Sequence, residues 1–153
     1  MANTFTSLSY HVVFSTKYRY RMISDQLAPE LYKYVGGILR EHNSQPVEIN
    51  GVEDHIHILT SIAPTIAVSD LARTVKANSS KWVRENHARK FAWQNGYAAF
   101  TVSISQLETV RRYVANQHEH HRKMSFREEY LTLLQKHRIR YEEKYVFDEE
   151  HLG

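Results

Sequence analysis

Three stretches of the chain alternate between apolar and polar residues, the pattern of strands whose two faces meet different surroundings. Residues 8–19 place four apolar side chains on one face, namely Leu8, Tyr10, Val12 and Phe14. Residues 45–62 read as two strands around a turn at Asn50-Gly51, a dipeptide favoured in tight hairpins. Residues 95–105 alternate again, with Phe100, Val102 and Ile104 on one side. We therefore predict four strands.

Other stretches repeat their apolar residues at helical spacing. Residues 26–40 have such a stripe at Leu27, Leu31, Tyr34, Val35 and Ile38. Residues 65–83 have another at Val68, Leu71, Val75 and Trp82. A third helix is predicted from about Gln106 to His121 and a fourth from Phe126 to His137, whereas residues 138–153 are too polar for an assignment.

The predicted order is β-α-β-β-α-β followed by further helices, which indicates an α+β fold of the ferredoxin-like type. In this arrangement an antiparallel four-stranded sheet has two helices on one face. The chain of 153 residues has the size of one domain, so we predict a single domain over 1–153. We expect the second face of the sheet to be free for a site or a partner.

The composition of the chain excludes several kinds of catalytic and metal site. The chain has no cysteine, which excludes disulfides, a thiolate zinc site and a cysteine nucleophile. Its net charge of +3 is compatible with a polyanionic partner but does not by itself indicate one. Neither a signal-peptide pattern nor a run of about 18 apolar residues is present. We expect a soluble cytoplasmic protein without a membrane partner.

The stretch "DHIHIL" (54–59) holds a candidate metal site. On a strand, His55 and His57 point to one face, while Ile56 and Ile58 point to the other. Two imidazoles at such positions can bind one divalent cation. The alternative is a pair of solvated or hydrogen-bonded side chains. In a chain with 10 histidines, the spacing His-x-His can arise by chance.

A second His-x-His pair, in "HEHH" (118–121), lies on the predicted third helix. Helical residues two positions apart point about 200° apart, so His118 and His120 are poorly placed to share an ion. We expect His120 and His121 to be surface histidines, with contact to DNA or to the edge of the site as the alternative.

Tyr113 and Gln117 lie one turn apart on the third helix, at the edge of its apolar stripe, from where both can reach the sheet. A carboxamide oxygen can complete a site with His55 and His57 and leave positions open for substrate oxygens. A phenol with a pKa of about 10 is a weak nucleophile, so phosphoryl transfer to it needs such a cation. The alternative is a packed ring at Tyr113 and a solvated amide at Gln117.

Together these features resemble the single-tyrosine HUH transposases of small bacterial and archaeal insertion sequences, of the IS200/IS605 type. HUH denotes histidine, a hydrophobic residue and histidine. The resemblance covers nearly the whole chain. It rests on "YHVVFSTKYR" (10–19), "GVEDHIHIL" (51–59), "VKANSSKWV" (75–83), "FAWQNGYAAFTVS" (91–103), "YVANQHEHH" (113–121) and "SFREEYLTLL" (125–134).

The resemblance implies that His55, His57 and Gln117 bind Mg²⁺ or Mn²⁺ and that Tyr113 is the nucleophile. The tyrosine would attack single-stranded DNA, form a 5′-phosphotyrosine and release a 3′-hydroxyl, which later rejoins strands without a nucleotide cofactor. It also implies a homodimer, joined edge to edge through the sheets, with the tyrosine helix able to complete the partner's site. The substrate would carry hairpins near the element ends.

Basic residues near two of these stretches are candidate DNA contacts, namely Lys17, Arg19, Arg73, Lys76, Lys81 and Arg84. Nearby rings such as Tyr18 and Tyr20 could stack on bases. The alternative is an ordinary solvated basic surface.

Two other functions stay open from the residues alone. One is a domesticated nuclease or hairpin processor with the same site, which only the flanking genome would distinguish. The other is a non-catalytic nucleic-acid-binding module, in which Tyr113→Phe would leave function intact.

Overall fold

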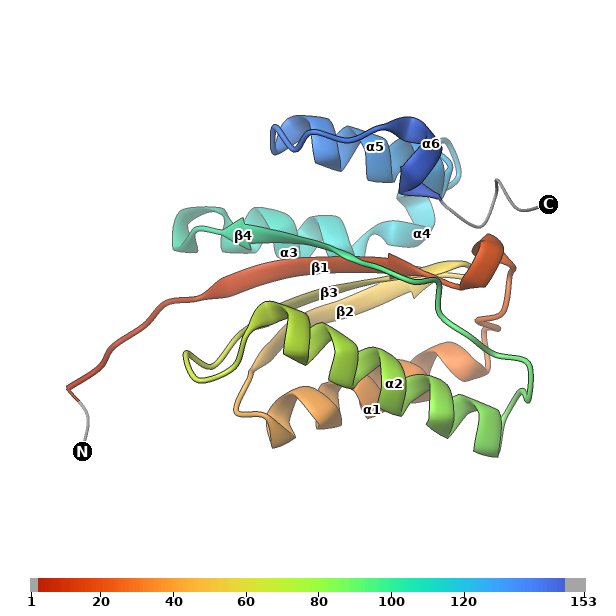
Figure 1. Ribbon diagram of the computed structural model, residues 1–153, viewed down its shortest axis with the longest axis horizontal. Coiled ribbons are helices and arrows are strands. Elements are labelled where there is room, and N and C mark those ends of the chain that lie inside the picture. Colours follow the sequence, from red (N-terminus) through yellow and green to blue (C-terminus); the bar gives the residue numbers. More distant parts are fainter. Residues whose placement is uncertain (1–2, 148–153) are drawn as a thin grey trace.

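The computed structural model describes residues 3–147. Residues 1–2 and 148–153, which the predicted single domain includes, lie outside the described residues. Four strands form an antiparallel sheet in the order β2-β3-β1-β4 (Figure 1). Their bounds are Ser9–Ser15 for β1, Pro46–Val52 for β2, His55–Ser61 for β3 and Ala98–Val102 for β4.

Helices α1 (Leu27–Glu41) and α2 (Val68–Asn86) cover one face of the sheet (Figure 1). The main core lies between them and the sheet. The strands contribute Val12, Phe14, Ile56 and Ile58, and the helices contribute Leu31, Val35, Leu71 and Val75, all of them buried. The period-two and helical patterns predicted these faces, and the ferredoxin-like α+β fold is confirmed.

The other face of the sheet is covered by the C-terminal helices of the same chain (Figure 1). These are α3 (Leu107–Ala115), α4 (Gln117–His120), α5 (Phe126–Lys136) and α6 (Glu143–Val146), and short 3₁₀ turns η1 (Lys17–Arg19) and η2 (Ile104–Gln106) follow β1 and β4. Val13 and Phe100 pack there against Phe126 and Leu134 in a second core. The expectation of an open second face was wrong, because these apolar side chains need cover.

The turn between β2 and β3 lies at Glu53 and Asp54, not at Asn50-Gly51 as predicted. Asn50 and Gly51 are part of β2 and pair with His57 and Ile56. A Cβ at Gly51 would lie 2.2 Å from the carbonyl oxygen of His55. Glycine is therefore needed for close approach of two strands rather than for a turn.

The predicted third helix is broken at Asn116, whose φ of −101° and ψ of 24° are not helical. The side chain of Asn50 donates from Nδ2 to the carbonyl oxygens of Val114, at 3.1 Å, and Ala115, at 3.0 Å. These bonds attach the break to β2.

The last strand is also shorter than predicted. It ends at Val102, and Ile104 is 74% exposed in η2. Within residues 3–147, no helix combines the length and apolar character needed to cross a bilayer.

Candidate active site

Strand β3 presents His55 and His57 toward the C-terminal helices, as the alternation predicted. Both side chains are fully buried, at 0% exposure. On the opposite face of the same strand, Ile56 and Ile58 enter the main core.

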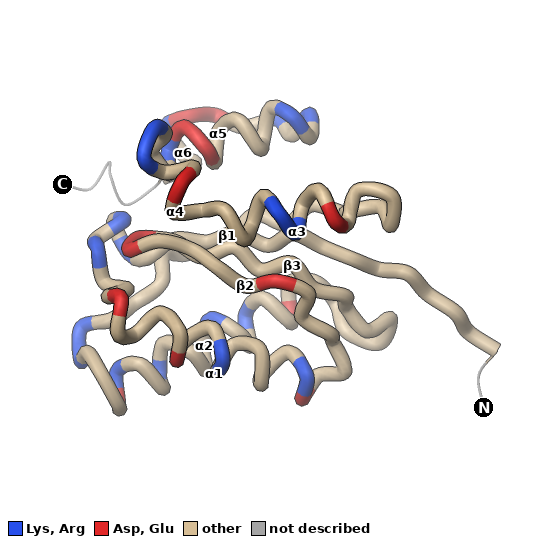
Figure 2. Tube along the Cα trace, turned by 180° about the vertical axis from the view of Figure 1, so that it is seen from behind, with Lys and Arg blue, Asp and Glu red and all other residues tan. Residues whose placement is uncertain are grey.

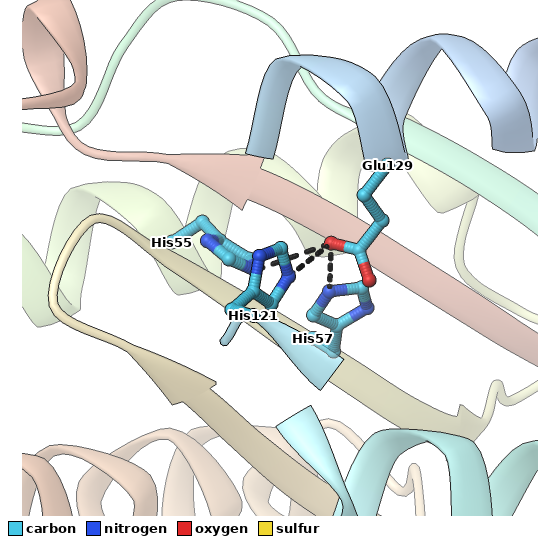
Figure 3. A group of neighbouring side chains, drawn as sticks. All are labelled: His55, His57, His121 and Glu129. Atoms are coloured by element: carbon cyan, nitrogen blue, oxygen red, sulfur yellow. Dashed lines mark hydrogen bonds and ion pairs between the residues drawn. The ribbon is translucent and has the colours of Figure 1, made fainter. Parts of the chain in front are cut away.

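A third histidine and a carboxylate join this pair from the C-terminal part of the chain (Figure 3). Oε1 of Glu129, on α5, lies 3.3 Å from Nε2 of His55 and 3.0 Å from Nε2 of His57. It lies 2.9 Å from Nε2 of His121, which follows α4. We call His55, His57, His121 and Glu129 the four-residue cluster.

The geometry of the four-residue cluster fits a divalent cation. Its ligand atoms all lie within 4.8 Å of one another. Neighbouring ligands of an octahedral ion with bonds of about 2.1 Å are about 3.0 Å apart, which matches the contacts of the Glu129 oxygen. Three imidazole nitrogens and a carboxylate are also donors that such ions accept.

The second ring nitrogen of each histidine is held by another group. Nδ1 of His55 lies 2.7 Å from Asp54 Oδ1, and Nδ1 of His121 lies 2.6 Å from the carbonyl oxygen of Met124. Both oxygens only accept, so each Nδ1 carries the hydrogen and each Nε2 is turned to the cluster. Nδ1 of His57 lies 2.7 Å from Nε2 of buried His11, which gives the third ring the same orientation.

Glu129 was not among the predicted site residues, and the prediction of a surface position for His121 was wrong, whereas the alternative of a place at the edge of the site fits the structure. The side chain of His121 is 9% exposed, rather than free on the surface. Glu129 is 1% exposed. One signal was available: Glu129 falls on the side of α5 that carries Phe126 and Leu133, and a charge on an apolar helix face usually has a buried partner.

Tyr113 and Gln117 both reach the four-residue cluster from the same chain. The Tyr113 hydroxyl donates a hydrogen bond to Oε2 of Glu129, and its ring centre is 5.9 Å from that of His57. Fully buried Gln117 places Oε1 3.2 Å from Nε2 of His55 and donates from Nε2 to Glu129 at 3.2 Å. The structure thus brings together all four residues predicted for the site.

His120 lies beside this assembly and His118 does not. Nε2 of His120 is 3.4 Å from the Tyr113 hydroxyl, with the side chain 32% exposed. His118, which helical geometry predicted to be poorly placed to share an ion with His120, is exposed.

The pKa values of His55 and His57 are shifted in opposite directions. Burial lowers the pKa of His55, but hydrogen bonds to Asp54 and Glu129 outweigh it and raise the pKa to about 9. For His57, burial prevails over the attraction of Glu129, and the pKa falls to about 4. Without a cation, one imidazole is therefore charged near neutral pH and the other is neutral.

The carboxylate and the phenol also differ from their ordinary behaviour. Burial raises the pKa of Glu129, yet hydrogen bonds from His121, His55 and His57 outweigh it and hold the pKa far below its usual range. Burial and the negative charge of Glu129 raise the pKa of Tyr113 well above its usual value. A positive charge near the phenol would lower the pKa of Tyr113.

Three of the basic residues predicted to contact DNA line a groove of about 480 Å³ between α2 and residues 92–97, namely Arg73, Lys76 and Arg84. Lys76 has a structural role, because Nζ donates to the carbonyl oxygens of Gln94 and Gly96 at 2.6 Å each. Arg73 pairs with Asp70 at 3.0 Å.

The other three lie elsewhere. Lys17 is exposed on η1, and the Arg19 guanidinium lies 4.7 Å from the centre of the Phe147 ring. Lys81 is exposed on α2. Figure 2 shows basic residues on both layers of helices with acidic residues among them, rather than one patch of a single sign. Their contact with DNA stays a prediction.

Similar proteins identify the class. The chain is 30% identical over 131 residues to the transposase for insertion sequence element IS200 of Salmonella typhimurium, covering 78% of this chain and 82% of that protein. It is 24% identical over 119 residues to the ISDra2 transposase TnpA of Deinococcus radiodurans, covering 73% and 85%. The class is a transposase, an enzyme that acts on DNA.

The family follows from a match over most of the chain. Residues 4–117 match the family model described as "Transposase IS200 like", and the chain belongs to that family. The matched range includes His55, His57, Tyr113 and Gln117 but ends before His121 and Glu129.

Two solved structures share the fold. A putative transposase from Deinococcus radiodurans R1 superposes with a TM-score of 0.62 at 21% identity, covering 76% of this chain and 96% of that chain. A REP associated tyrosine transposase bound to a REP hairpin has a TM-score of 0.54 at 10% identity, covering 76% and 72%. At these identities the likeness concerns the fold alone.

Proposed function

We propose that this transposase cleaves and rejoins single-stranded DNA through a covalent bond to Tyr113, with the help of a divalent cation. The observation that carries the proposal is the position of the Tyr113 hydroxyl. It shares the Glu129 carboxylate as a hydrogen-bond partner with His55 and His57, and all these residues come from one chain.

The proposed chemistry is two successive phosphoryl transfers. The Tyr113 oxygen bonds to a DNA phosphorus and the bond from phosphorus to the 3′-oxygen breaks. The phenol loses its proton to solvent, because the pKa of its hydrogen-bond acceptor Glu129 is too low for that carboxylate to keep it. The leaving oxygen takes up a proton to become a 3′-hydroxyl. A 3′-hydroxyl then attacks the 5′-phosphotyrosine and Tyr113 leaves as a phenol. Because the ester keeps the energy of the phosphodiester, joining needs no nucleotide cofactor.

The chain's own residues would hold and position the cation. We assign this role to His55, His57 and Gln117, together with His121 and Glu129. When bound, a divalent cation would polarise the phosphate and offset the charge that develops on its oxygens. Mg²⁺ and Mn²⁺ are the candidates, and a set with three imidazoles favours Mn²⁺, because Mg²⁺ prefers oxygen ligands.

The proposed substrate is single-stranded DNA with hairpins at the ends of an insertion sequence. Support comes from the REP hairpin bound to the tyrosine transposase whose fold is similar to that of this chain. We also propose a homodimer joined through sheet edges, since β2 and β4 are edge strands that can pair with another chain. Within one chain Tyr113 already reaches the cluster, so exchange of tyrosine helices would be an additional state rather than a requirement.

The test is formation of a denaturation-resistant adduct with labelled hairpin oligonucleotides in the presence of Mn²⁺ or Mg²⁺. We expect the adduct with the natural chain, none with Tyr113→Phe, and much less with His57→Ala. Tyr145→Phe, at an exposed tyrosine on α6, is the matched control and should leave the adduct unchanged. An adduct that persists in Tyr113→Phe would reject the nucleophile.

A further inference from the structure

A cavity of about 430 Å³ lies directly against Tyr113. It is lined by residues of β1, β4, η2, α3 and the end of α5, with Tyr113 and His11 in its wall. His11 hydrogen-bonds to His57, and Tyr113 to Glu129, so the cavity adjoins the four-residue cluster through both residues. The four residues of the cluster itself do not line this wall.

The wall of this cavity has the chemistry of a nucleobase site. The exposed ring of His137 stacks on the buried ring of Phe100, with ring centres 4.2 Å apart and planes at 21°, and presents its other face to a base. Thr109 and Gln106 add exposed polar groups, and Lys136 adds a positive charge. Aromatic rings stack on bases of any sequence, polar groups bond the base edge, and a lysine attracts the phosphate that follows.

We propose that this cavity binds the nucleobase next to the phosphate that Tyr113 attacks. The inference rests on the proposed function, because it takes Tyr113 as the nucleophile. A phosphate in contact with Tyr113 carries a nucleoside on each side, and so one flanking base must lie within the reach of a single nucleotide. The cavity volume is within the range of about 300–1,000 Å³ of small-molecule sites, which accommodates a flipped base.

The groove along α2 is of similar size but does not lie beside Tyr113. Its lining contains Arg73, Lys76 and Arg84 but no residue of the four-residue cluster and not Tyr113. It can contact DNA only at a distance from the reacting phosphate.

The experiment compares substrates that lack one base. Hairpin oligonucleotides carry an abasic site at either nucleotide flanking the cleaved phosphate, and the rate of adduct formation with Mn²⁺ is measured. We expect one abasic position to slow the natural chain about tenfold or more, the size of one lost stacking interaction. Thr109→Trp, which fills the cavity from an exposed position, should slow the intact substrate comparably and abolish the difference between intact and abasic DNA.

Ser105→Trp is the control, because Ser105 is exposed on the neighbouring turn and does not line the cavity. It should keep the natural dependence on the base. His137→Ala provides a second variant, which should weaken the preference for intact DNA by removing one ring. If Thr109→Trp and His137→Ala discriminate abasic DNA as the natural chain does, or if neither flanking base matters, the cavity is not the base site.

Equilibrium binding separates this proposal from the proposed function. Tyr113→Phe protein cannot form the adduct, so the ratio of its Kd values for intact and abasic oligonucleotides reports binding of the missing base without the covalent step. A weaker Kd for one abasic position, lost on adding Thr109→Trp, supports the cavity even if no adduct forms with the natural chain. Adduct formation with equal Kd values would uphold the nucleophile and overturn the base site.

Discussion

At the scale of single residues, the orientation of each imidazole depends on a partner outside the four-residue cluster. Asp54, His11 and the carbonyl group of Met124 each bond one Nδ1, which turns the three Nε2 atoms toward one point. Partners of this kind are as important for a metal site as its ligands, because they set the tautomer and the angle of the ring.

Asp54→Ala should therefore weaken Mn²⁺ binding about 10- to 100-fold, measured by titration calorimetry, without removing any ligand. Glu53→Ala is the matched control, since it removes a carboxylate from the same turn and should leave the affinity nearly unchanged. Equal effects of both substitutions would mean that charge near the site, rather than the hydrogen bond to His55, is responsible.

The shifted pKa values give the metal-free protein a defined response to pH. The pKa of His55 is raised to about 9, so its contribution to the free energy of unfolding is complete below the unfolded pKa of about 6.5 and is lost as pH rises through 9. The pKa of His57 is lowered to about 4, so its contribution is present above about 6.5 and is lost below that value.

In urea unfolding with a chelator present, we expect stability to fall between pH 6.5 and pH 9. Glu129→Gln should flatten this dependence, because it removes a carboxylate that favours the charged His55. Mn²⁺ affinity should change in the opposite direction and rise over the same interval, since a ligand nitrogen must be free of its proton. Stability that is constant over this interval in the natural chain would contradict the assignment to His55.

At the scale of elements, the break between α3 and α4 positions the candidate nucleophile. Asn50 on β2 holds the carbonyl groups of Val114 and Ala115, between Tyr113 and Gln117. The non-helical backbone of Asn116 changes the direction of the chain between Tyr113 on α3 and Gln117 and His121 after it.

Asn50→Ala should cost about 1–3 kcal/mol of stability and reduce adduct formation more than the loss of folded protein explains. Asn86→Ala is the control, because Asn86 also donates to a main-chain carbonyl, at 2.9 Å, but on the exposed side of α2. Stability is measured by urea unfolding and adduct formation below the unfolding transition. Normal adduct yield in Asn50→Ala would show that the break does not depend on this side chain.

At the scale of the whole molecule, the four-residue cluster connects the sheet to the C-terminal helices, which are far apart in the sequence. His55 and His57 come from β3 of the sheet, whereas His121 and Glu129 come from the C-terminal part of the chain (Figure 3). A bound cation would thus stabilise the attachment of α5 as well as assist the chemistry.

Mn²⁺ should therefore raise the Tm, by an increment equivalent to about 3 kcal/mol at 100 times the Kd, and a chelator should reverse it. Glu129→Gln should reduce this increment strongly. Glu128→Gln, at the adjacent exposed carboxylate, should retain it. The Tm is measured by calorimetry. If Mn²⁺ raises the Tm of both variants by the same amount, Glu129 is not a ligand.

The local period of the sequence determined which side of an element each residue occupies. Alternation placed His55 and His57 on one face of β3, and the four-residue spacing placed Tyr113 near Gln117. These predictions depend only on backbone geometry within a few residues, so they are confirmed even where the turn before β3 and the end of the third helix were predicted wrongly.

Only the tertiary structure decided which distant elements meet at that face. The approach of α5 brings Glu129 to the histidines, Gly51 pairs with Ile56 within the sheet instead of forming the turn, and Asn50 hydrogen-bonds to the break in the tyrosine helix. Each depends on contacts between residues far apart in the chain, whose free energy comes from burial and from satisfying polar groups across layers. A periodic pattern contains no information on such partners, and for this reason the face predicted to be open is instead closed around the site.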